Sequence, residues 1–176
     1  MTDQELVEGC LANDAKAQRF LYNKYAGKMM GVCLRYMKNR EEAQDILQEG
    51  FIKVYQKIGQ FKSTGPLGGW IRMVMINTAL IQIRNNKKWE NTIEVSSAYD
   101  LSTDDYTVLD KLSADELMRI INGLPDGYRT VFNLFVIEGY PHKEIAKMLE
   151  VSESTSKTQF RKARLYLKKI LEENGE

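Results

Sequence analysis

The sequence predicts an all-α protein with two helical domains joined by a flexible acidic linker. Three observations support this: N-cap residues recur along both flanks, apolar residues follow helical spacing, and convincing alternating strand patterns are absent. A polar stretch from Asn91 to Glu116 separates the flanks and contains few aliphatic residues. With 176 residues, 43% of them hydrophobic and 28% charged, the chain is long enough to bury a core and is not disordered in composition.

The N-terminal flank begins with two expected helices. Thr2 and Glu5 have the spacing of a capping box, in which each side chain satisfies a backbone N–H of the first turn. Apolar residues follow at helical spacing, namely Leu6, Cys10 and Leu11. A second helix is expected over about residues 14–38, with apolar contacts from Phe20, Leu21, Tyr25, Val32 and Tyr36.

A third helix is expected from the N-cap signature of Asn39 and Glu42 to about Ile58. Its apolar stripe consists of Ala43, Leu47, Gly50, Val54 and Ile58. The turn-forming segment 62–66 then interrupts the helical pattern, and a fourth helix follows to about Asn86.

The C-terminal flank is expected to contain four more helices. Ser113 and Glu116 repeat the capping-box spacing, Gly123 and Gly139 are natural stops, and Ser152 is a further cap. The expected ranges are 113–123, 126–138, 141–149 and 152–171. The last two helices are joined by about three residues, which are the proportions of a helix-turn-helix.

The net charge of +1, from 25 basic and 24 acidic residues, hides an uneven distribution. Residues 1–90 carry 14 basic and 9 acidic side chains, residues 91–116 carry 1 and 7, and residues 117–176 carry 10 and 8. We interpret 91–112 as an acidic linker between domains 1–90 and 113–176. The alternative is a long surface loop within one domain, although structureless loops of that length are uncommon.

The last helix carries most of the basic charge of the C-terminal flank. Between Ser152 and Lys169 there are six basic residues and one acidic residue. An inward stripe contains Ser156, Phe160, Ala163, Leu167 and Leu171, and the opposite face carries hydroxyls and cations. Such a face suits DNA recognition, because guanidinium and hydroxyl groups bind phosphates and base edges. The alternative is an ordinary solvated basic face.

The small numbers of histidine and cysteine residues make several classes of protein unlikely candidates. His142 is the one histidine, and the two cysteines form no CxxC pair, so His-dependent hydrolases, zinc sites and disulfide scaffolds are not expected. We expect two buried free thiols, no cofactor and no metal. The acidic N-terminal sequence predicts no signal peptide, and no stretch is apolar enough to predict a membrane span.

Short motifs along the C-terminal flank identify a family. They are Gly123–Arg129 (GLPDGYR), Glu138–Tyr140 (EGY), His142–Ala146 (HKEIA) and Ser152 through Arg164. In this order and spacing they resemble region 4 of the extracytoplasmic-function sigma factors, the smallest bacterial sigma factors. That resemblance implies two helical domains and a connecting linker.

The N-terminal flank resembles the same family independently. Ala43–Phe51 (AQDILQEGF) resembles region 2.2, the helix that grips a coiled coil of the largest polymerase subunit. Residues similar to the regions that melt and read the minus-ten element are Phe61, Trp70, Ile71, Val74, Asn77, Ala79 and Arg84. Together the resemblances cover about residues 4–90 and 112–171.

The resemblance, together with the expected outer faces of the helices and the positions of their charged side chains, gives three sets of candidate contacts. Core polymerase is expected to contact Asp45, Gln48, Glu49, Phe51 and Tyr55. Minus-ten DNA is expected to contact Phe61, Lys62, Ser63, Trp70, Arg72, Asn77, Arg84, Lys87 and Lys88. Minus-thirty-five DNA is expected to contact Ser154, Thr155, Lys157, Thr158, Arg161, Lys162 and Arg164.

Some of these residues have a plain structural alternative. Phe51 could belong to the core, and Trp70 could pack within the domain instead of stacking on a base. Asn77 could read a base edge or cap a buried backbone group. The cations could be solvated charges.

The chain departs from the family pattern at several positions. Ile81 replaces the usual Asp, and Leu67 replaces a common aromatic. Glu150 replaces the turn glycine, where a side chain requires a strained backbone, and Ser154 replaces a second glycine. Arg161 stands where a small residue is common and adds a candidate DNA contact.

The resemblance implies a cytoplasmic sigma factor that directs core RNA polymerase to promoters and itself catalyses no reaction. An anti-sigma factor is a further expected class of partner. Two alternatives stay open: an ordinary helix-turn-helix regulator, and a sigma-mimicking adaptor that binds an anti-sigma protein but not DNA. An enzyme is disfavoured by the single histidine and the absence of a phosphate-binding glycine loop.

Overall fold

The computed structural model describes residues 1–86 and 113–174, and every regular element within these ranges is a helix. The all-α prediction is therefore confirmed for this part of the chain. Two compact units are present, Met1–Ile83 and Arg84–Glu176, and the boundary falls in the last turn of the fourth helix. Residues 91–112, predicted to form the linker, lie outside the described residues.

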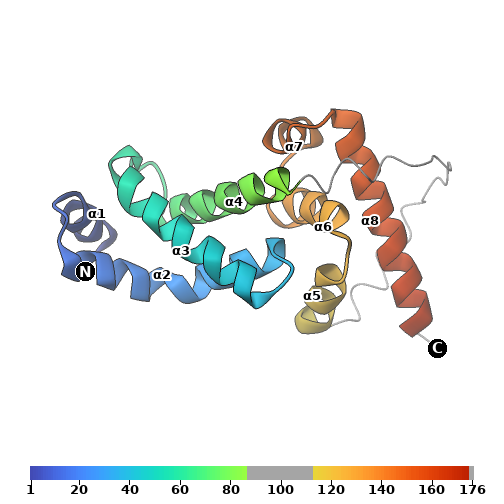
Figure 1. Ribbon diagram of the computed structural model, residues 1–176, viewed down its shortest axis with the longest axis horizontal. Helices are drawn as coiled ribbons and strands as arrows, with labels where there is room; N and C mark the ends of the chain where they lie inside the picture. The colour runs from blue at the N-terminus through green and yellow to red at the C-terminus, as the bar shows by residue number, and fades with distance from the viewer. Residues whose placement is uncertain (87–112, 175–176) are drawn as a thin grey trace. The chain divides into compact units, whose positions relative to one another are not determined.

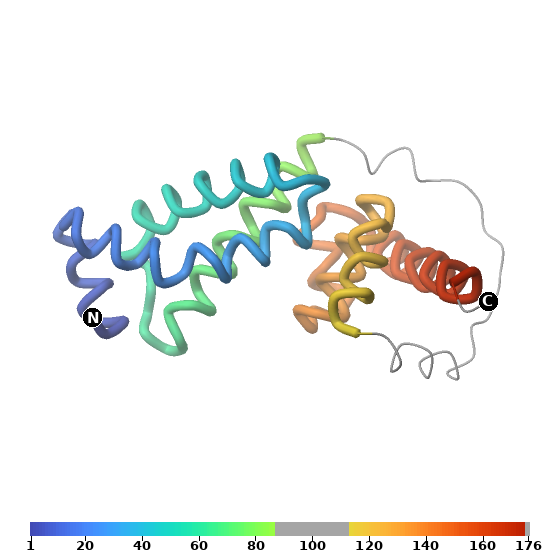
Figure 2. The backbone as a smooth tube through the Cα atoms, turned by 90° about the horizontal axis from the view of Figure 1, so that it is seen from below, coloured from blue at the N-terminus to red at the C-terminus, as the bar shows by residue number. Residues whose placement is uncertain are grey.

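The N-terminal unit is a helical bundle (Figure 1). Its elements are α1 (Asp3–Leu11), α2 (Ala15–Tyr36), α3 (Arg40–Lys57), the short 3₁₀ helix η1 (Ile58–Gln60) and α4 (Leu67–Asn85). Helices α2 and α3 run antiparallel (Figures 1 and 2), and α4 approaches α3 where Met75 lies against Gly50. Among the described residues, no helix is long and apolar enough to cross a membrane.

Local caps determine where the first helices begin. Thr2 and Glu5 form the predicted capping box, with Thr2 Oγ1 accepting the Glu5 N–H at 3.2 Å. Asp14 caps α2 by accepting the Lys16 N–H at 2.9 Å, and Asn39 caps α3. These short-range hydrogen bonds satisfy N–H groups that have no partner inside the helix.

The core of the N-terminal unit confirms the predicted stripe of α3. Each of its members is buried: Ala43, Leu47, Gly50, Val54 and Ile58. A Cβ added at Gly50 would overlap the Met75 sulfur, so glycine permits the close approach of α3 and α4. Cys10 and Cys33 are free and buried, as expected.

The C-terminal unit contains α5 (Ala114–Asn122), α6 (Asp126–Phe132), the π-helical segment η4 (Asn133–Ile137), α7 (His142–Leu149) and α8 (Glu153–Asn174). The single helix predicted over 126–138 is therefore corrected, because its last turn has the wider π geometry. Gly139 follows at φ 78°, in the left-handed region that favours glycine. Helix α8 also ends later than predicted.

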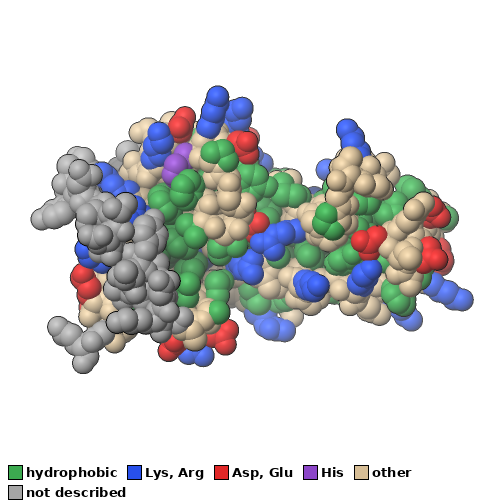
Figure 3. Space-filling model, turned by 180° about the vertical axis from the view of Figure 1, so that it is seen from behind, with side chains coloured by type: hydrophobic (Ala, Val, Ile, Leu, Met, Phe, Trp, Pro, Cys, Tyr) green, Lys and Arg blue, Asp and Glu red, His purple; other side chains and the backbone are tan. Residues whose placement is uncertain are grey.

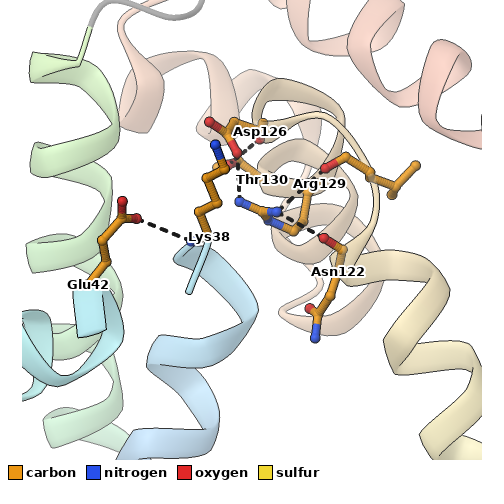
Figure 4. A network of polar contacts seen from close by, with 7 residues as sticks. Lys38, Glu42, Asn122, Asp126, Arg129 and Thr130 are labelled. Atoms are coloured by element: carbon orange, nitrogen blue, oxygen red, sulfur yellow. Dashed lines mark hydrogen bonds and ion pairs between the residues drawn. The ribbon is translucent and has the colours of Figure 1, made fainter. Parts of the chain in front are cut away.

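A buried hydrophobic cluster and one arginine organise this unit. The cluster consists of Ile121, Leu124, Phe132, Ala163 and Leu167. Figure 4 shows the Arg129 guanidinium directed at the Asn122 carbonyl oxygen, 3.1 Å away, and at the Asp126 carboxylate, 2.8 Å away. Arg129 belongs to the GLPDGYR motif, and its buried charge joins the end of α5 to the start of α6.

Candidate functional site

The exposed side of α3 presents the polar residues predicted to contact a partner. Asp45, Gln48 and Glu49 are exposed and lie off the buried stripe of the helix. Glu49 forms an ion pair with Lys53, with Oε1 and Nζ 2.6 Å apart. The structure therefore leaves Asp45 and Gln48 as accessible polar groups one turn apart, on a rigid helix.

Phe51 is placed differently from the prediction, which assigned it to the interface with polymerase. Its side chain is 2% exposed, and its ring lies 4.7 Å from that of Tyr22 and 6.2 Å from that of Tyr55, measured between centroids. Packing against α2 holds the ring in the core. Phe51 therefore supports the exposed face of α3 from beneath and offers no free ring to a partner.

Tyr55 remains partly accessible at the edge of the same face. Its hydroxyl donates to the Gln18 carbonyl at 3.0 Å, and burial raises its pKa to about 12. Ile52, which was not among the predicted contacts, has an exposed fraction of 56%. Its position four residues after Gln48 places it on the same side of the helix and could have identified it.

The loop between η1 and α4 contains the first predicted minus-ten residues. Lys62 and Ser63 are exposed, and Ser63 has a left-handed backbone at φ 54°. The ring of Phe61 lies 5.9 Å from that of Trp70, and both side chains are half-buried. This contact favours a packing role for Trp70 over a free stacking platform.

The outer side of α4 carries the other candidates of that set. Asn77 is exposed, which favours access to a base edge over capping of a buried backbone group. Arg72 and Arg84 are half-buried, and Ile81, the departure from the family pattern, has an exposed side chain. Lys87 and Lys88 lie outside the described residues.

Helices α7 and α8 form the predicted helix-turn-helix. The turn contains Glu150 in the left-handed conformation, at φ 56° and ψ 43°, as expected for a side chain at a glycine position. Ser152 caps α8 by accepting the Thr155 N–H at 3.0 Å. The short turn and this cap fix the direction in which α8 begins.

The two sides of α8 differ as the sequence predicted, with one addition. Ser156, Ala163 and Leu167 are buried, Phe160 is half-buried, and Gln159 is buried although it was not predicted. Ser154 and Lys157 are exposed, and the half-buried remainder of the predicted set is Thr155, Thr158, Arg161, Lys162 and Arg164. Arg164 stacks over Phe160, with its guanidinium carbon 5.9 Å from the ring centroid.

His142, at the start of α7, links the two helices of the motif. Its Nδ1 lies 2.9 Å from the Ser156 hydroxyl oxygen, and its ring stacks on Phe135 with centroids 4.4 Å apart. Burial, with the positive charge of Lys157, lowers the pKa of the imidazole. The imidazole, purple in Figure 3, borders hydrophobic side chains at the surface. Its role in packing was not predicted.

Comparison with known families and proteins agrees with this geometry. Sigma-70 region 2 matches residues 21–89, and Sigma-70, region 4 matches residues 114–167. The ECF RNA polymerase sigma-E factor of Haemophilus influenzae is 30% identical, over 93% of this chain and 92% of the relative. The RNA polymerase sigma-H factor of Pseudomonas aeruginosa is 28% identical, over 97% and 94%.

A solved structure shares the fold. The sigma factor RpoE from Bartonella quintana, in a co-crystal with the anti-sigma factor NepR, aligns with a TM-score of 0.52 at 16% identity, over 88% of this chain and 96% of that one. The two regional matches fall on the two helical units, and the relatives align over nearly the whole length. The chain therefore belongs to the sigma-70 family as an extracytoplasmic-function sigma factor, which directs RNA polymerase to promoters.

Proposed function

We propose that the N-terminal domain, residues 1–90, binds core polymerase and opens the minus-ten element, while the domain formed by residues 113–176 reads the minus-thirty-five element. Residues 91–112 would then connect the two. The observation that supports this most is α8, which follows a helix-turn-helix turn and combines a buried side with a side of hydroxyls and cations.

For the polymerase contact we propose Asp45, Gln48, Glu49 and Tyr55, with Phe51 supporting them from the core. An accessible polar face beside a partly exposed aromatic residue is a common composition for a protein interface. For the minus-ten element we propose Phe61, Lys62, Ser63, Trp70, Arg72, Asn77, Arg84, Lys87 and Lys88. Their aromatic, polar and cationic groups suit single-stranded bases and their phosphates.

For the minus-thirty-five element we propose Ser154, Thr155, Lys157, Thr158, Arg161, Lys162 and Arg164. Residues near the N-terminus of a recognition helix read bases in the major groove, while cations further along bind phosphates. Arg161 is the residue of this set that we expect to contribute most beyond the family pattern.

We propose that the protein acts in the cytoplasm without a cofactor and leaves all chemistry to the polymerase. An anti-sigma factor is a second candidate partner, because the solved relative was crystallised with one. An adaptor that binds only an anti-sigma protein would not need the basic side of α8.

Run-off transcription with purified core polymerase tests the proposed function. We expect transcripts from a defined set of promoters that are absent with core polymerase alone. Arg161→Ala should lower promoter affinity and reduce the salt dependence of binding by about one counterion, with unchanged affinity for core polymerase.

Lys169→Ala is the matched control, because Lys169 is an exposed cation near the other end of α8. Loss of core binding by the Arg161 variant would contradict its assignment to DNA. A failure to support any promoter-specific transcript would favour the adaptor alternative.

A further inference from the structure

The first turn of α4 needs a hydrogen-bond acceptor that its own segment does not supply. Helix α4 follows Pro66, whose side chain has no acceptor. The Pro66 carbonyl accepts the N–H groups of Gly69 and Trp70, at 3.0 and 3.4 Å. The N–H of Leu67 has no acceptor within the helix, and the residue is 0% exposed, so bulk water does not supply one.

Asp3, from the first turn of α1, supplies this acceptor. The Leu67 N–H donates to the Asp3 carboxylate. Asp3 Oδ1 also accepts from Lys24 Nζ at 2.8 Å and from the Tyr25 hydroxyl at 2.9 Å, both in α2. One carboxylate therefore joins α1, α2 and the start of α4, where a negative charge is also favoured by the helix dipole.

The ring of Tyr25 holds the same turn by direct packing. A Cβ added at Gly68 would lie 2.9 Å from Tyr25 Cε1, so the ring rests closely against the second residue of α4. Tyr25 itself is buried. Asp3 and Tyr25 together clamp the beginning of α4.

The loop formed by residues 61–66 leads directly into this clamped turn. At its other end, the Phe61 N–H donates to the Ile58 carbonyl at 3.1 Å. The ring contact between Phe61 and Trp70 closes the loop at its base, while Lys62 and Ser63 stay exposed. The ends of the loop are therefore fixed and its middle is accessible.

We propose that Asp3 is a positioning residue for promoter opening, which caps α4 and thereby holds the loop 61–66 ready to take up an unpaired base. This rests on the function proposed above for the loop. A loop with fixed ends loses less conformational entropy on binding. None of the three donors to Asp3 lies in α3, so the polymerase contact does not depend on the cap.

The test measures promoter opening by reconstituted holoenzyme on a duplex promoter mapped by run-off transcription. With Asp3→Ala we expect opening, followed as permanganate reactivity of unpaired thymines, to slow by about fivefold, with unchanged affinity for core polymerase. Asp14→Ala is the matched control, because it removes the cap of α2 in the same domain and leaves α4 untouched. We expect this control to open the promoter at the wild-type rate.

A second substitution separates capping from general support of the fold. Adding Pro66→Asp to Asp3→Ala places a new acceptor at the N-cap position of α4, where it can accept the Gly68 or Gly69 N–H and so fix the same first turn through another donor. We expect it to restore opening towards the rate of Pro66→Asp alone. If Asp3 only attaches α1 to α2, this change restores nothing. Absent rescue, unchanged opening with Asp3→Ala, or a parallel loss of core affinity each overturns the proposal.

Loop variants keep the two proposals distinguishable. If Lys62→Ala combined with Ser63→Ala leaves opening unchanged, the loop does not take up DNA and the function proposed for it fails. If that variant slows opening while Asp3→Ala does not, only the capping role is wrong.

Discussion

Glu150 gives the turn between α7 and α8 its left-handed backbone, a conformation in which a side chain costs about 1 kcal/mol relative to glycine. The turn still satisfies the end of α7, because the Val151 N–H donates to the Ala146 carbonyl at 3.0 Å. The cost is therefore in the backbone of one residue and not in lost hydrogen bonds.

Replacing Glu150 by glycine should relieve this cost. We expect Glu150→Gly to raise the free energy of unfolding of the C-terminal domain by about 1 kcal/mol, measured by urea denaturation and circular dichroism. Glu153→Gly is the matched control, since a glycine at the first residue of α8, whose backbone is not left-handed, relieves no strain and should not raise stability. If Glu150→Gly instead lowers the free energy of unfolding, the backbone of Glu150 is not strained.

His142 is the titratable group most closely involved in the packing of the helix-turn-helix. Its imidazole forms a cluster with the rings of Phe135 and Phe160, which also contact each other, and lies within hydrogen-bond distance of the Ser156 hydroxyl. Lys157 and Glu153 are the charges that act on it. Desolvation, the largest cause, and Lys157 both disfavour the protonated ring, so the pKa in the folded protein lies below the usual 6.5.

This depressed pKa makes the stability of the C-terminal domain depend on pH. Between its pKa in the unfolded chain, near 6.5, and its lower pKa in the folded domain, the imidazole binds a proton only in the unfolded chain, so stability should fall as the pH drops below about 7.5 towards the folded-state pKa. Carboxyl groups with a lowered pKa, such as that of Glu116, change the stability of the domain only at more acidic pH. We expect His142→Gln to flatten this slope in thermal unfolding, and an NMR titration should give the imidazole a pKa below 6.5.

At the scale of elements, α3 and α8 are each divided lengthwise into a buried and an accessible side. In α3 the buried side includes Gly50 and Phe51, and the accessible side carries Asp45 and Gln48. Because the helix is held by its core contacts, side chains on the outer face are presented in a fixed arrangement. Such preorganisation lowers the entropy lost on binding.

Shortening the side chains on the outer face of α3 should therefore lower the affinity for core polymerase and leave the affinity for DNA unchanged. We expect Asp45→Ala combined with Gln48→Ala to lower affinity for core polymerase by about tenfold or more, with unchanged thermal stability. Lys57→Ala is the control, since Lys57 is exposed in the last turn of the same helix, twelve residues from Asp45, and lies outside the predicted set. Unchanged core affinity, measured by fluorescence titration, would exclude this face as the polymerase contact.

At the scale of the whole molecule, the two compact units have separate hydrophobic cores. The C-terminal core is built from α5, α6 and α8, and Arg129 ties α5 to α6. All of these residues lie after the acidic stretch of the sequence. A unit whose core is complete in itself is expected to fold without the other.

Residues 113–176 expressed alone should accordingly be helical and unfold cooperatively. We expect the same midpoint as the corresponding transition of the full chain, measured by circular dichroism. Leu167→Ala, which removes a buried side chain from the cluster, should lower stability by about 2–5 kcal/mol and abolish the transition in so small a domain. A fragment without helical signal would contradict the predicted boundary.

The sequence by itself determined the helical class, the helix caps at Thr2, Asn39, Ser113 and Ser152, the family, and the unusual residue at the turn. These features depend on residues a few positions apart, so short-range spacing is enough to predict them. The tertiary structure decided that Phe51 is core, that η4 is a π-helical turn, and that His142 meets Ser156. It also brought Asp3 to the start of α4. Each of these depends on which helix packs against which, and a pattern within one segment carries no information about a partner distant in the chain.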